Sequence, residues 1–371
     1  MSVEMTRDRA KAYQRQKQVL HLVHLAVSPA ILLLAAVTPV SRLLHQCAVA
    51  AGGPPYAVLS FYFLFLSLFL MIFDLPFDFY SGFILEHRFG LSNQNLRAWI
   101  ADFLKRSVLS FVFSLAMIAA LYALIWHYPA QWWVIAWAAY AVVGYVFGKL
   151  FPVLIVPLFY KYSPVEDGFL RERIFALAKR YGMPVGNVYS LNLSRKTKKA
   201  NAAFMGIGRT KRVILSDTLL ANFTPEEIES VLAHELGHYK HRDIWRQLGF
   251  GLVASFISFL CIFLCIEPVA RGLGYGGAGD LGAMPVLFLA GSLLGLVLTP
   301  LQSAFSRRME RAADRFSLEA FAYPDIFISA MEKLGALNLA DPSPHPVYEW
   351  FFYSHPSIPK RVAMARNWKR T

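Results

Sequence analysis

Residues 224–238 read T-P-E-E-I-E-S-V-L-A-H-E-L-G-H, and they combine a strong helix start with two histidines four residues apart. Thr224 suits the N-cap, Pro225 suits the first helical position, and Glu227 completes a capping box. Apolar residues then recur with the period of a helix. We therefore expect a helix that begins after Thr224 and continues to about Asp243.

The two histidines frame the motif H-E-x-x-H. His234 and His238 project from one face of a helix, so both imidazole rings can bind a single Zn²⁺. Glu235 follows the first histidine and can reach a water molecule bound to that metal. The pattern is typical of zinc metallopeptidases, but a motif this short also arises by chance. The rest of the chain therefore decides whether the motif belongs to a site.

A catalytic zinc takes three protein ligands and keeps one position open. His241 lies on the same helix face as His234, but a straight helix cannot bring histidines from two turns onto one ion, so we interpret His241 as a polar residue at the membrane interface. Residues 306–314, S-R-R-M-E-R-A-A-D, hold Glu310 and Asp314 four residues apart. Paired acids among arginines usually form a solvated surface. Here Glu310 can complete a site of two histidines and one glutamate, and Asp314 can orient a ligand histidine.

The composition indicates a membrane protein. The 371 residues are 56% hydrophobic and 16% charged, whereas typical soluble domains are about 25% charged. The mean hydropathy is +0.42. The net charge of +13 would suit a nucleic-acid partner, but the basic residues stand at the ends of apolar runs, where the positive-inside rule places them. We therefore expect a lipid bilayer, and no nucleic acid, as the surroundings of this chain.

Six apolar runs approach or exceed the ~20 residues that a helix needs to cross a membrane. They cover about residues 20–44, 56–73, 107–126, 132–160, 248–266 and 284–305. Loops rich in Lys and Arg alternate with loops that have one or none. The positive-inside rule then places both termini and the segment 161–247 in the cytoplasm. These features predict an integral multi-pass membrane protein with six transmembrane helices.

The segment 161–247 is the main soluble insertion. Its residues 167–181 have the pattern of an amphipathic helix. Three stretches favour strands, the last two of them joined around residues 206–208: residues 187–193, 201–205 and 212–216. We therefore expect a small β-sheet beside the metal-binding helices. The chain divides into four parts: residues 1–160 with four spans, 161–247, 248–305 with two spans, and 306–371 with the third ligand.

Several motifs, taken together and in order, resemble the type I CAAX prenyl endopeptidases, which are integral-membrane zinc metallopeptidases. The resemblance extends from about residue 56 to residue 366. The matching stretches are Y-S-G-F-I-L-E at 80–86 with F-G at 89–90, P-L-F at 157–159, N-A-A-F at 201–204, I-L-S-D-T-L-L at 214–220, H-E-L-G-H at 234–238, R-M-E-R-A-A-D at 308–314 and S-H-P at 354–356. Eukaryotic members have one more N-terminal span, and we expect this chain to be a bacterial member in the inner membrane.

The resemblance implies a fold and a metal site. The fold is mainly α, a ring of long helices around an intramembrane chamber, with the zinc site and a small sheet at the cytoplasmic face. His234, His238 and Glu310 would bind one Zn²⁺, and Glu235 would act as the general base. Asp314 keeps the orienting role inferred from its spacing.

The resemblance also implies where a substrate binds. Asn201, Ala203 and Phe204 would lie on an edge strand that holds the peptide. His355 would face the substrate near the zinc and take part in catalysis, and Arg361 on the following helix would contact the substrate. The stretch K-A-N-A-A-F at 199–204 departs from the family's H-S-N-A-Y-F, and H-P-S at 355–357 departs from H-P-P. These departures concern the substrate sequence rather than the metal chemistry.

The features together predict a zinc-dependent membrane endopeptidase. Its substrates would be CAAX-type prenylated peptides or other membrane-associated peptides. One alternative is a membrane quality-control zinc protease that acts on unfolded membrane proteins. A second is a non-catalytic multi-pass binding or transport protein with a structural zinc, and a third is a membrane protein with an accidental motif.

Overall fold

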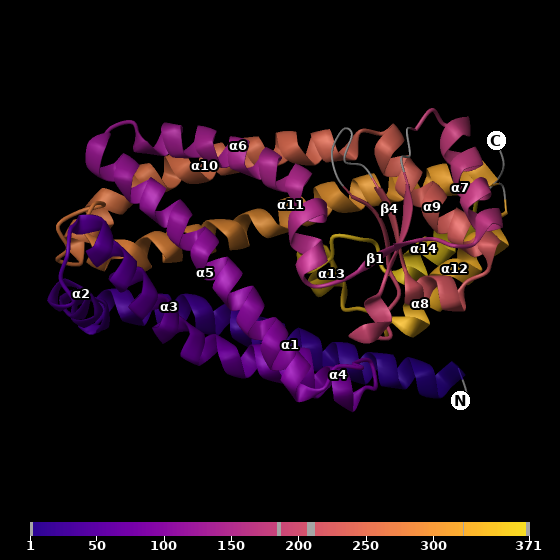
Figure 1. Ribbon diagram of the computed structural model, residues 1–371, viewed down its shortest axis with the longest axis horizontal. Helices are drawn as coiled ribbons and strands as arrows, with labels where there is room; N and C mark the ends of the chain where they lie inside the picture. Colours follow the sequence, from indigo (N-terminus) through magenta and orange to yellow (C-terminus); the bar gives the residue numbers. More distant parts are fainter. Residues whose placement is uncertain (1–2, 184–186, 206–211, 322, 369–371) are drawn as a thin grey trace.

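The computed structural model of the chain describes residues 3–183, 187–205, 212–321 and 323–368. Long helices form most of the molecule, and a small mixed α/β part sits at one end of them (Figure 1). Six helical runs among the described residues are long and apolar enough to cross a membrane: Arg7–Val37, Pro55–Arg88, Leu96–His127, Trp132–Leu158, Asp243–Gly272 and Leu281–Phe321. The six predicted spans are thus confirmed.

Two of the predicted spans differ in detail. The expected first run over residues 20–44 is wrong as a single helix, because α1 (Val3–Val37) ends before Pro39 and a separate short helix, α2 (Val40–Ala50), follows. Pro39 has no N–H to donate to the preceding turn, and it disfavours the helical conformation of Thr38 before it. The fourth span begins as α6 (Trp132–Leu150) and continues with a π-helical turn, Phe151–Ile155, and a 3₁₀ turn, Val156–Leu158. It is therefore one run whose helical pitch changes near its prolines.

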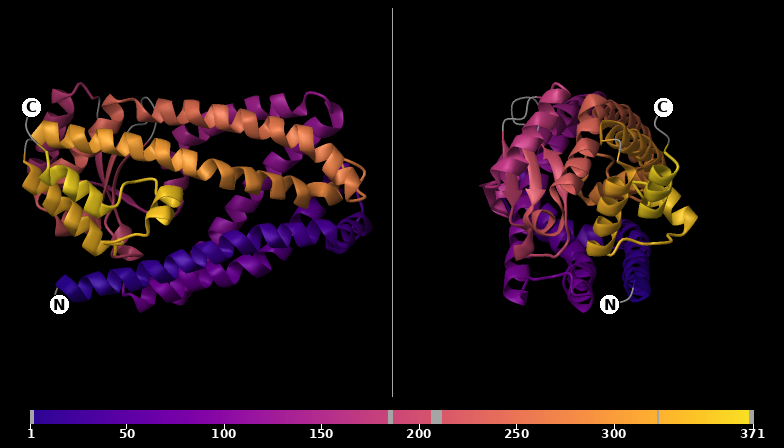
Figure 2. Two further views of the ribbon diagram at one scale, coloured as in Figure 1. Left: turned by 180° about the vertical axis from the view of Figure 1, so that it is seen from behind. Right: turned by 90° about the vertical axis from the view of Figure 1, so that its right-hand side faces the viewer.

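The long helices surround internal space. Helices α1 and α3 (Pro55–Phe79) run side by side on one side of the molecule, and α10 (Asp243–Gly272) and α11 (Met284–Phe321) lie across from them (Figure 2). α5 (Leu96–His127) crosses between the two sides, from the level of α4 (Leu85–Arg88) to that of α6. A mostly apolar cavity of about 1170 Å³ lies between α5, the fourth span and the sheet.

The small sheet has four strands in the order β1-β2-β4-β3. Their bounds are Tyr162–Pro164 for β1, Val188–Leu191 for β2, Ala202–Met205 for β3 and Arg212–Ser216 for β4. β2 and β4 are parallel, whereas the outer pairs are antiparallel. The three predicted strands are present, and β1 is an addition. The turn expected at residues 206–208 lies outside the described residues. β3 is an edge strand, so one of its sides pairs with no other strand among the described residues.

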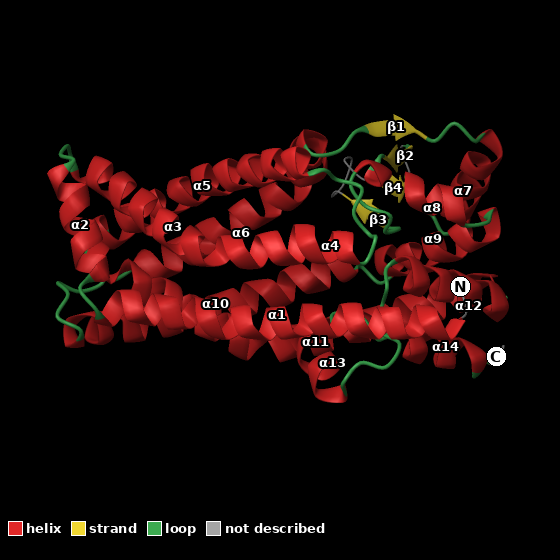
Figure 3. Ribbon diagram, turned by 90° about the horizontal axis from the view of Figure 1, so that it is seen from below, coloured by secondary structure: helices red, strands yellow, loops and turns green. Residues whose placement is uncertain are grey.

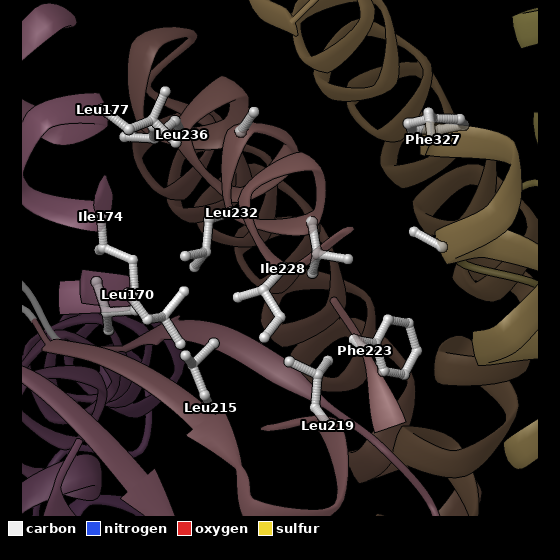
Figure 4. Close-up of a cluster of buried hydrophobic side chains, with 14 of the residues drawn as sticks. Leu170, Ile174, Leu177, Leu215, Leu219, Phe223, Ile228, Leu232, Leu236 and Phe327 are labelled. Carbon is white, nitrogen blue, oxygen red and sulfur yellow. The ribbon is translucent and has the colours of Figure 1, made fainter. Parts of the chain in front are cut away.

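A hydrophobic core joins the sheet to the helices around it (Figure 4). α7 (Gly168–Arg180) contributes the predicted apolar face, and Leu215 of β4 packs beneath it. The other helices of this end are α8 (Asp217–Asn222), α9 (Pro225–Lys240), α12 (Pro324–Leu337), α13 (Pro346–Phe352) and α14 (Ile358–Arg366). Burial of these side chains fixes α9 between the sheet and α12.

α9 begins as predicted and ends earlier than predicted. The Thr224 hydroxyl accepts from the Glu227 N–H, and the Glu227 carboxylate accepts from the Thr224 N–H, which completes the capping box. The helix stops at Lys240 rather than near Asp243, because Arg242 adopts a left-handed conformation with φ of 57°. α10 then starts at Asp243 in a new direction.

Candidate metal centre

Two helices bring three ligand atoms together. His234 and His238 lie on α9, and Glu310 lies on α11. The two Nε2 atoms are 3.2 Å apart. The glutamate oxygens lie 3.2 Å from Nε2 of His234 and 3.4 Å from Nε2 of His238. Among the described residues, these three form the one group of His, Cys, Asp and Glu side chains with metal-ligand spacing.

The three residues fit a metal ion. Ligand atoms about 2.0–2.1 Å from a tetrahedral ion are about 3.3–3.4 Å from one another, which matches the measured separations. Oε2 of Glu310 is buried and has no hydrogen-bond donor within the described part of the chain. Two facing imidazole nitrogens and a carboxylate oxygen without a hydrogen bond are suitable ligand atoms for a divalent cation. Two nitrogens and one oxygen leave a fourth position open.

Each histidine is held from behind by a buried carboxylate. Nδ1 of His234 is 2.7 Å from Oδ1 of Asp314, which has no exposed surface. Nδ1 of His238 is 2.9 Å from Oδ2 of Asp243, which is 2% exposed. Such partners fix the ring orientation and leave Nε2 free for a metal. The contact of Asp314 with a ligand histidine was predicted from its position four residues after Glu310. The contact of Asp243 was not predicted, because it depends on the chain reversal at Arg242.

The carboxylates also change the protonation of the rings. Burial of His234 works against its charged form, but the charges of Asp314 and Glu310 outweigh burial and the opposing charge of Arg361, and they raise its pKa to about 9. Burial also opposes charging of His238, and the Glu310 carboxylate raises the pKa of this ring above its usual value. A metal ion that binds here must therefore displace protons.

Glu235 lies beside the ligands and faces a cavity. Its Oε2 is 3.4 Å from the backbone nitrogen of Phe204 in β3. The cavity has a volume of about 510 Å³, and Glu235, His234, Asn201 and His355 line it. The Glu235 carboxylate, the ligand His234 and the start of the edge strand thus line one space.

His355 reaches the same space from the loop between α13 and α14. Its Nε2 is 3.1 Å from Oε1 of Glu310, and its Nδ1 is 2.8 Å from the Ser354 hydroxyl. The side chain is 58% exposed. The ring is therefore close to the third ligand and accessible from the cavity.

The residues predicted to bind the substrate lie near β3, as Asn201 and Ala203 do, or behind the metal ligands, as Arg361 does. Asn201 precedes β3 and lines the cavity beside the metal site, whereas Ala203 lines the large apolar cavity. Arg361 lies deeper, and its Nε donates to Asp314 at 2.9 Å while Nη2 is 3.3 Å from Nδ1 of His234. Its visible role is to hold the Asp314 carboxylate behind the ligand. A contact of Arg361 with substrate stays a prediction.

His241 does not join the ligands. Its ring packs edge-on against Phe316, with centroids 6.2 Å apart, and its Nδ1 is buried without a partner among the described residues. Its position at the end of α9 agrees with the argument that one straight helix cannot supply all three ligands.

Comparison with protein families gives two matches that together cover nearly the whole chain. Residues 164–369 match the model described as peptidase family M48. Residues 3–161 match the model described as CAAX prenyl protease N-terminal, five membrane helices. The structure has four candidate spans within the described residues of that region, one fewer than the five helices that the description names.

Relatives and a solved structure agree with these matches. A Bacillus subtilis protein named uncharacterized metalloprotease YhfN is 30% identical over 81% of this chain and 71% of its own length. CAAX prenyl protease 1 of Saccharomyces cerevisiae is 30% identical over 91% of this chain and 76% of its own length. The crystal structure of S. mikatae Ste24p shares the fold, with a TM-score of 0.88 at 24% identity over 99% of this chain and 90% of that one. The chain therefore belongs to peptidase family M48 and is an integral-membrane metalloendopeptidase.

Proposed function

We propose that this protein is a zinc-dependent endopeptidase that cleaves CAAX-type prenylated peptides or other membrane-associated peptides. The observation that carries this proposal is the ligand triangle of His234, His238 and Glu310, because His234 and the adjacent Glu235 together line a cavity of about 510 Å³. Two imidazoles, one carboxylate and one open position are typical of catalytic zinc. A structural zinc needs a fourth protein ligand, and the described residues offer three at suitable spacing.

The residues around the ligands have distinct chemical roles in this proposal. Bound zinc would lower the pKa of a water molecule and polarise the scissile carbonyl group. Glu235 would accept the proton of that water and later deliver it to the leaving amine. His355, 3.1 Å from Glu310 and exposed to the cavity, donates a hydrogen bond to the oxygen that gains negative charge. Asp314 and Asp243 keep the ligand rings in place.

The edge strand offers a place for the peptide backbone. β3 pairs with β4 on one side, and on its other side the N–H of Phe204 points toward Glu235. An extended peptide can add to this free side as a further strand. Main-chain pairing places little demand on the peptide sequence. Asn201 at the start of β3 and Arg361 near the ligands are proposed to contact the substrate at the two ends of this path.

The large apolar cavity supports a lipidated or apolar substrate. It has a volume of about 1170 Å³ and reaches both the transmembrane helices and residues Asn201, Ala202 and Ala203. A peptide on β3 would thus have the metal site on one side and an apolar space on the other. Transfer of a prenyl chain from water into such a space is favourable.

The proposed location is the bacterial inner membrane with the metal site in the cytoplasm. Both termini lie at the same end of the long helices as the sheet and the metal-binding helices (Figure 3). The alternation of basic and non-basic loops supports the cytoplasmic side for this end.

Cleavage of matched peptides tests the substrate. The purified full-length protein is given a farnesylated CAAX peptide and the same peptide without the farnesyl group, and kcat/KM is measured for both. We expect the farnesylated peptide to be cleaved at least tenfold more efficiently. Equal cleavage of both peptides would instead favour the quality-control protease, and zinc binding without cleavage of either would favour a structural metal.

A further inference from the structure

A basic cleft lies beside the metal-carrying helices, at the C-terminal end of α9 and along α11, and none of the three ligand residues lines it. Its volume is about 310 Å³. Lys240 and His241 form its wall on α9, and Arg308, Arg311 and Arg315 form its wall on α11. The cleft contains four permanent positive charges, and Glu319 is the one carboxylate that lines it.

The three arginines form one row. They are separated by three and four residues, so they share a face of α11, and all three are exposed. None of them has a hydrogen bond or an ion pair within the part of the chain that the structure describes. Some other basic residues at this end do have carboxylate partners, as Lys333 has in Glu227 and Lys360 in Glu349. An uncompensated row of arginines is the arrangement that binds phosphate groups.

The α9 wall adds a further charge and an unsatisfied group. The ammonium group of Lys240 lies 4.7 Å from the centre of the Phe316 ring and has no carboxylate partner among the described residues. Nδ1 of His241 is buried without a hydrogen-bond partner in the same part of the chain. Lys240 on one wall and the three arginines on the other thus present donors, and Glu319 is the one carboxylate in the lining.

The position of the cleft identifies the source of the phosphate. Lys240 and His241 stand just before α10, and Arg308 follows the apolar part of α11, so the cleft lies at the same end of two candidate membrane spans. Ile244 and Trp245, at the start of α10, are 42% and 56% exposed. Exposed tryptophan beside basic residues is typical of the membrane interface. We propose that this cleft binds the phosphate group of an anionic phospholipid.

A lipid bound in this cleft would contact both helices that carry the metal ligands, α9 and α11. A Cβ atom added to Gly237 of α9 would lie 2.8 Å from Cα of Ala313 of α11, so the two helices are in close contact. The cleft is lined by residues of both helices, so it lies along the line where they pack against each other. A bound headgroup would hold both helices at the membrane surface without touching the ligands.

Lipid binding to full-length protein tests this inference. The protein is purified in an uncharged detergent, and binding of phosphatidylglycerol, phosphatidylcholine and inorganic phosphate is measured by native mass spectrometry and titration. The test variant is Arg308→Gln/Arg311→Gln/Arg315→Gln, and Lys240→Gln probes the other wall. The matched control is Arg97→Gln/Arg195→Gln/Lys198→Gln, which removes three exposed charges that do not line the cleft.

Wild type and control should bind phosphatidylglycerol in preference to phosphatidylcholine, and the triple arginine variant should bind it about tenfold or more weakly, because each basic residue contributes separately. Lys240→Gln should weaken binding by a smaller factor. Equal thermal unfolding of the three-site variants in detergent excludes misfolding as the cause. Equal loss in both triple variants, or tight binding of inorganic phosphate that displaces the lipid, would overturn the proposal. So would binding of a soluble phosphopeptide in place of the lipid.

Discussion

Asp314 connects a ligand histidine of the metal site to a buried arginine. It has no exposed surface, and it contacts both His234 and Arg361. The motif and its spacing predicted the two histidines, Glu310 and the Asp314 contact, because helical geometry relates residues four apart. Asp243 could not be predicted in the same way. It lies five residues after His238 and reaches the ring only because Arg242 reverses the chain.

The change Asp314→Asn tests this residue. The amide keeps the size of the side chain but removes the charge that orients His234 and pairs with the buried Arg361. We expect zinc affinity to fall by about 10–100-fold, as for other residues behind metal ligands. Competition with a chelator measures the affinity. The exposed Asp325→Asn on α12 serves as the control, and an unchanged affinity in Asp314→Asn would contradict the proposed role.

Protonation of the ligands leads to a second expectation. His234 has a pKa raised to about 9, and the pKa of His238 is also raised, so at pH 7 one or both rings carry an extra proton until a metal binds. Only a neutral ring can be a ligand. Zinc binding at pH 7 should therefore release about one to two protons per ion, and affinity should rise with pH until it levels off above about 9. Calorimetry in buffers of different ionisation enthalpy measures the release, and its absence at pH 7 would refute the raised pKa values.

At the scale of elements, local signals predicted most of the soluble part. The capping box marked the start of α9, alternating residues marked β2, and two short strand-favouring stretches marked β3 and β4. β1 was not predicted, because three residues that end in a proline, Tyr162–Pro164, carry no alternating pattern. The cross-over that places β4 between β2 and β3 is set by tertiary packing, which periodicity along the chain does not record.

Close packing of α9 on α11 gives a prediction for one glycine. A methyl group at Gly237 would meet the backbone of Ala313 at 2.8 Å, whereas nothing lies within 4 Å of one at Gly249. Gly237→Ala should therefore destabilise the protein by about 1–3 kcal/mol and weaken zinc binding. Gly249→Ala, also in a helix, should be neutral or slightly stabilising. Thermal unfolding compares the two variants, and equal stability would show that the helices can move apart at little cost.

The side chain of Asn338 helps to hold the segment before β3, together with the hydroxyl groups of Ser216 and Thr218. Oδ1 of Asn338 accepts from the Ala200 N–H at 2.9 Å, and its Nδ2 donates to the Ala200 carbonyl oxygen at 3.1 Å. Loss of both hydrogen bonds in Asn338→Ala should loosen the edge strand and raise KM about fivefold or more, since each bond contributes about 1 kcal/mol. Zinc content should stay at one per chain. An increase in KM for Asn222→Ala, whose amide bonds only within α8, would show that the effect is not specific.

At the scale of the whole molecule, hydropathy predicted the six spans and the end of the bundle that carries the site. It did not predict how the helices surround the cavity of about 1170 Å³, nor that this cavity reaches β3. Packing between helices in a membrane depends on small residues and shape rather than on hydrophobic periodicity. The meeting of an apolar cavity, an edge strand and the ligand triangle is thus visible only in the fold.

The most direct test of the central claim separates metal binding from proton transfer. Zinc content and peptide cleavage are measured for full-length wild type, Glu235→Gln and His234→Ala. We predict that Glu235→Gln keeps about one zinc per chain but loses cleavage by a factor of about 10²–10⁴, the usual contribution of a general base. His234→Ala should lose both zinc and cleavage. Undiminished cleavage by Glu235→Gln would contradict the proposed mechanism.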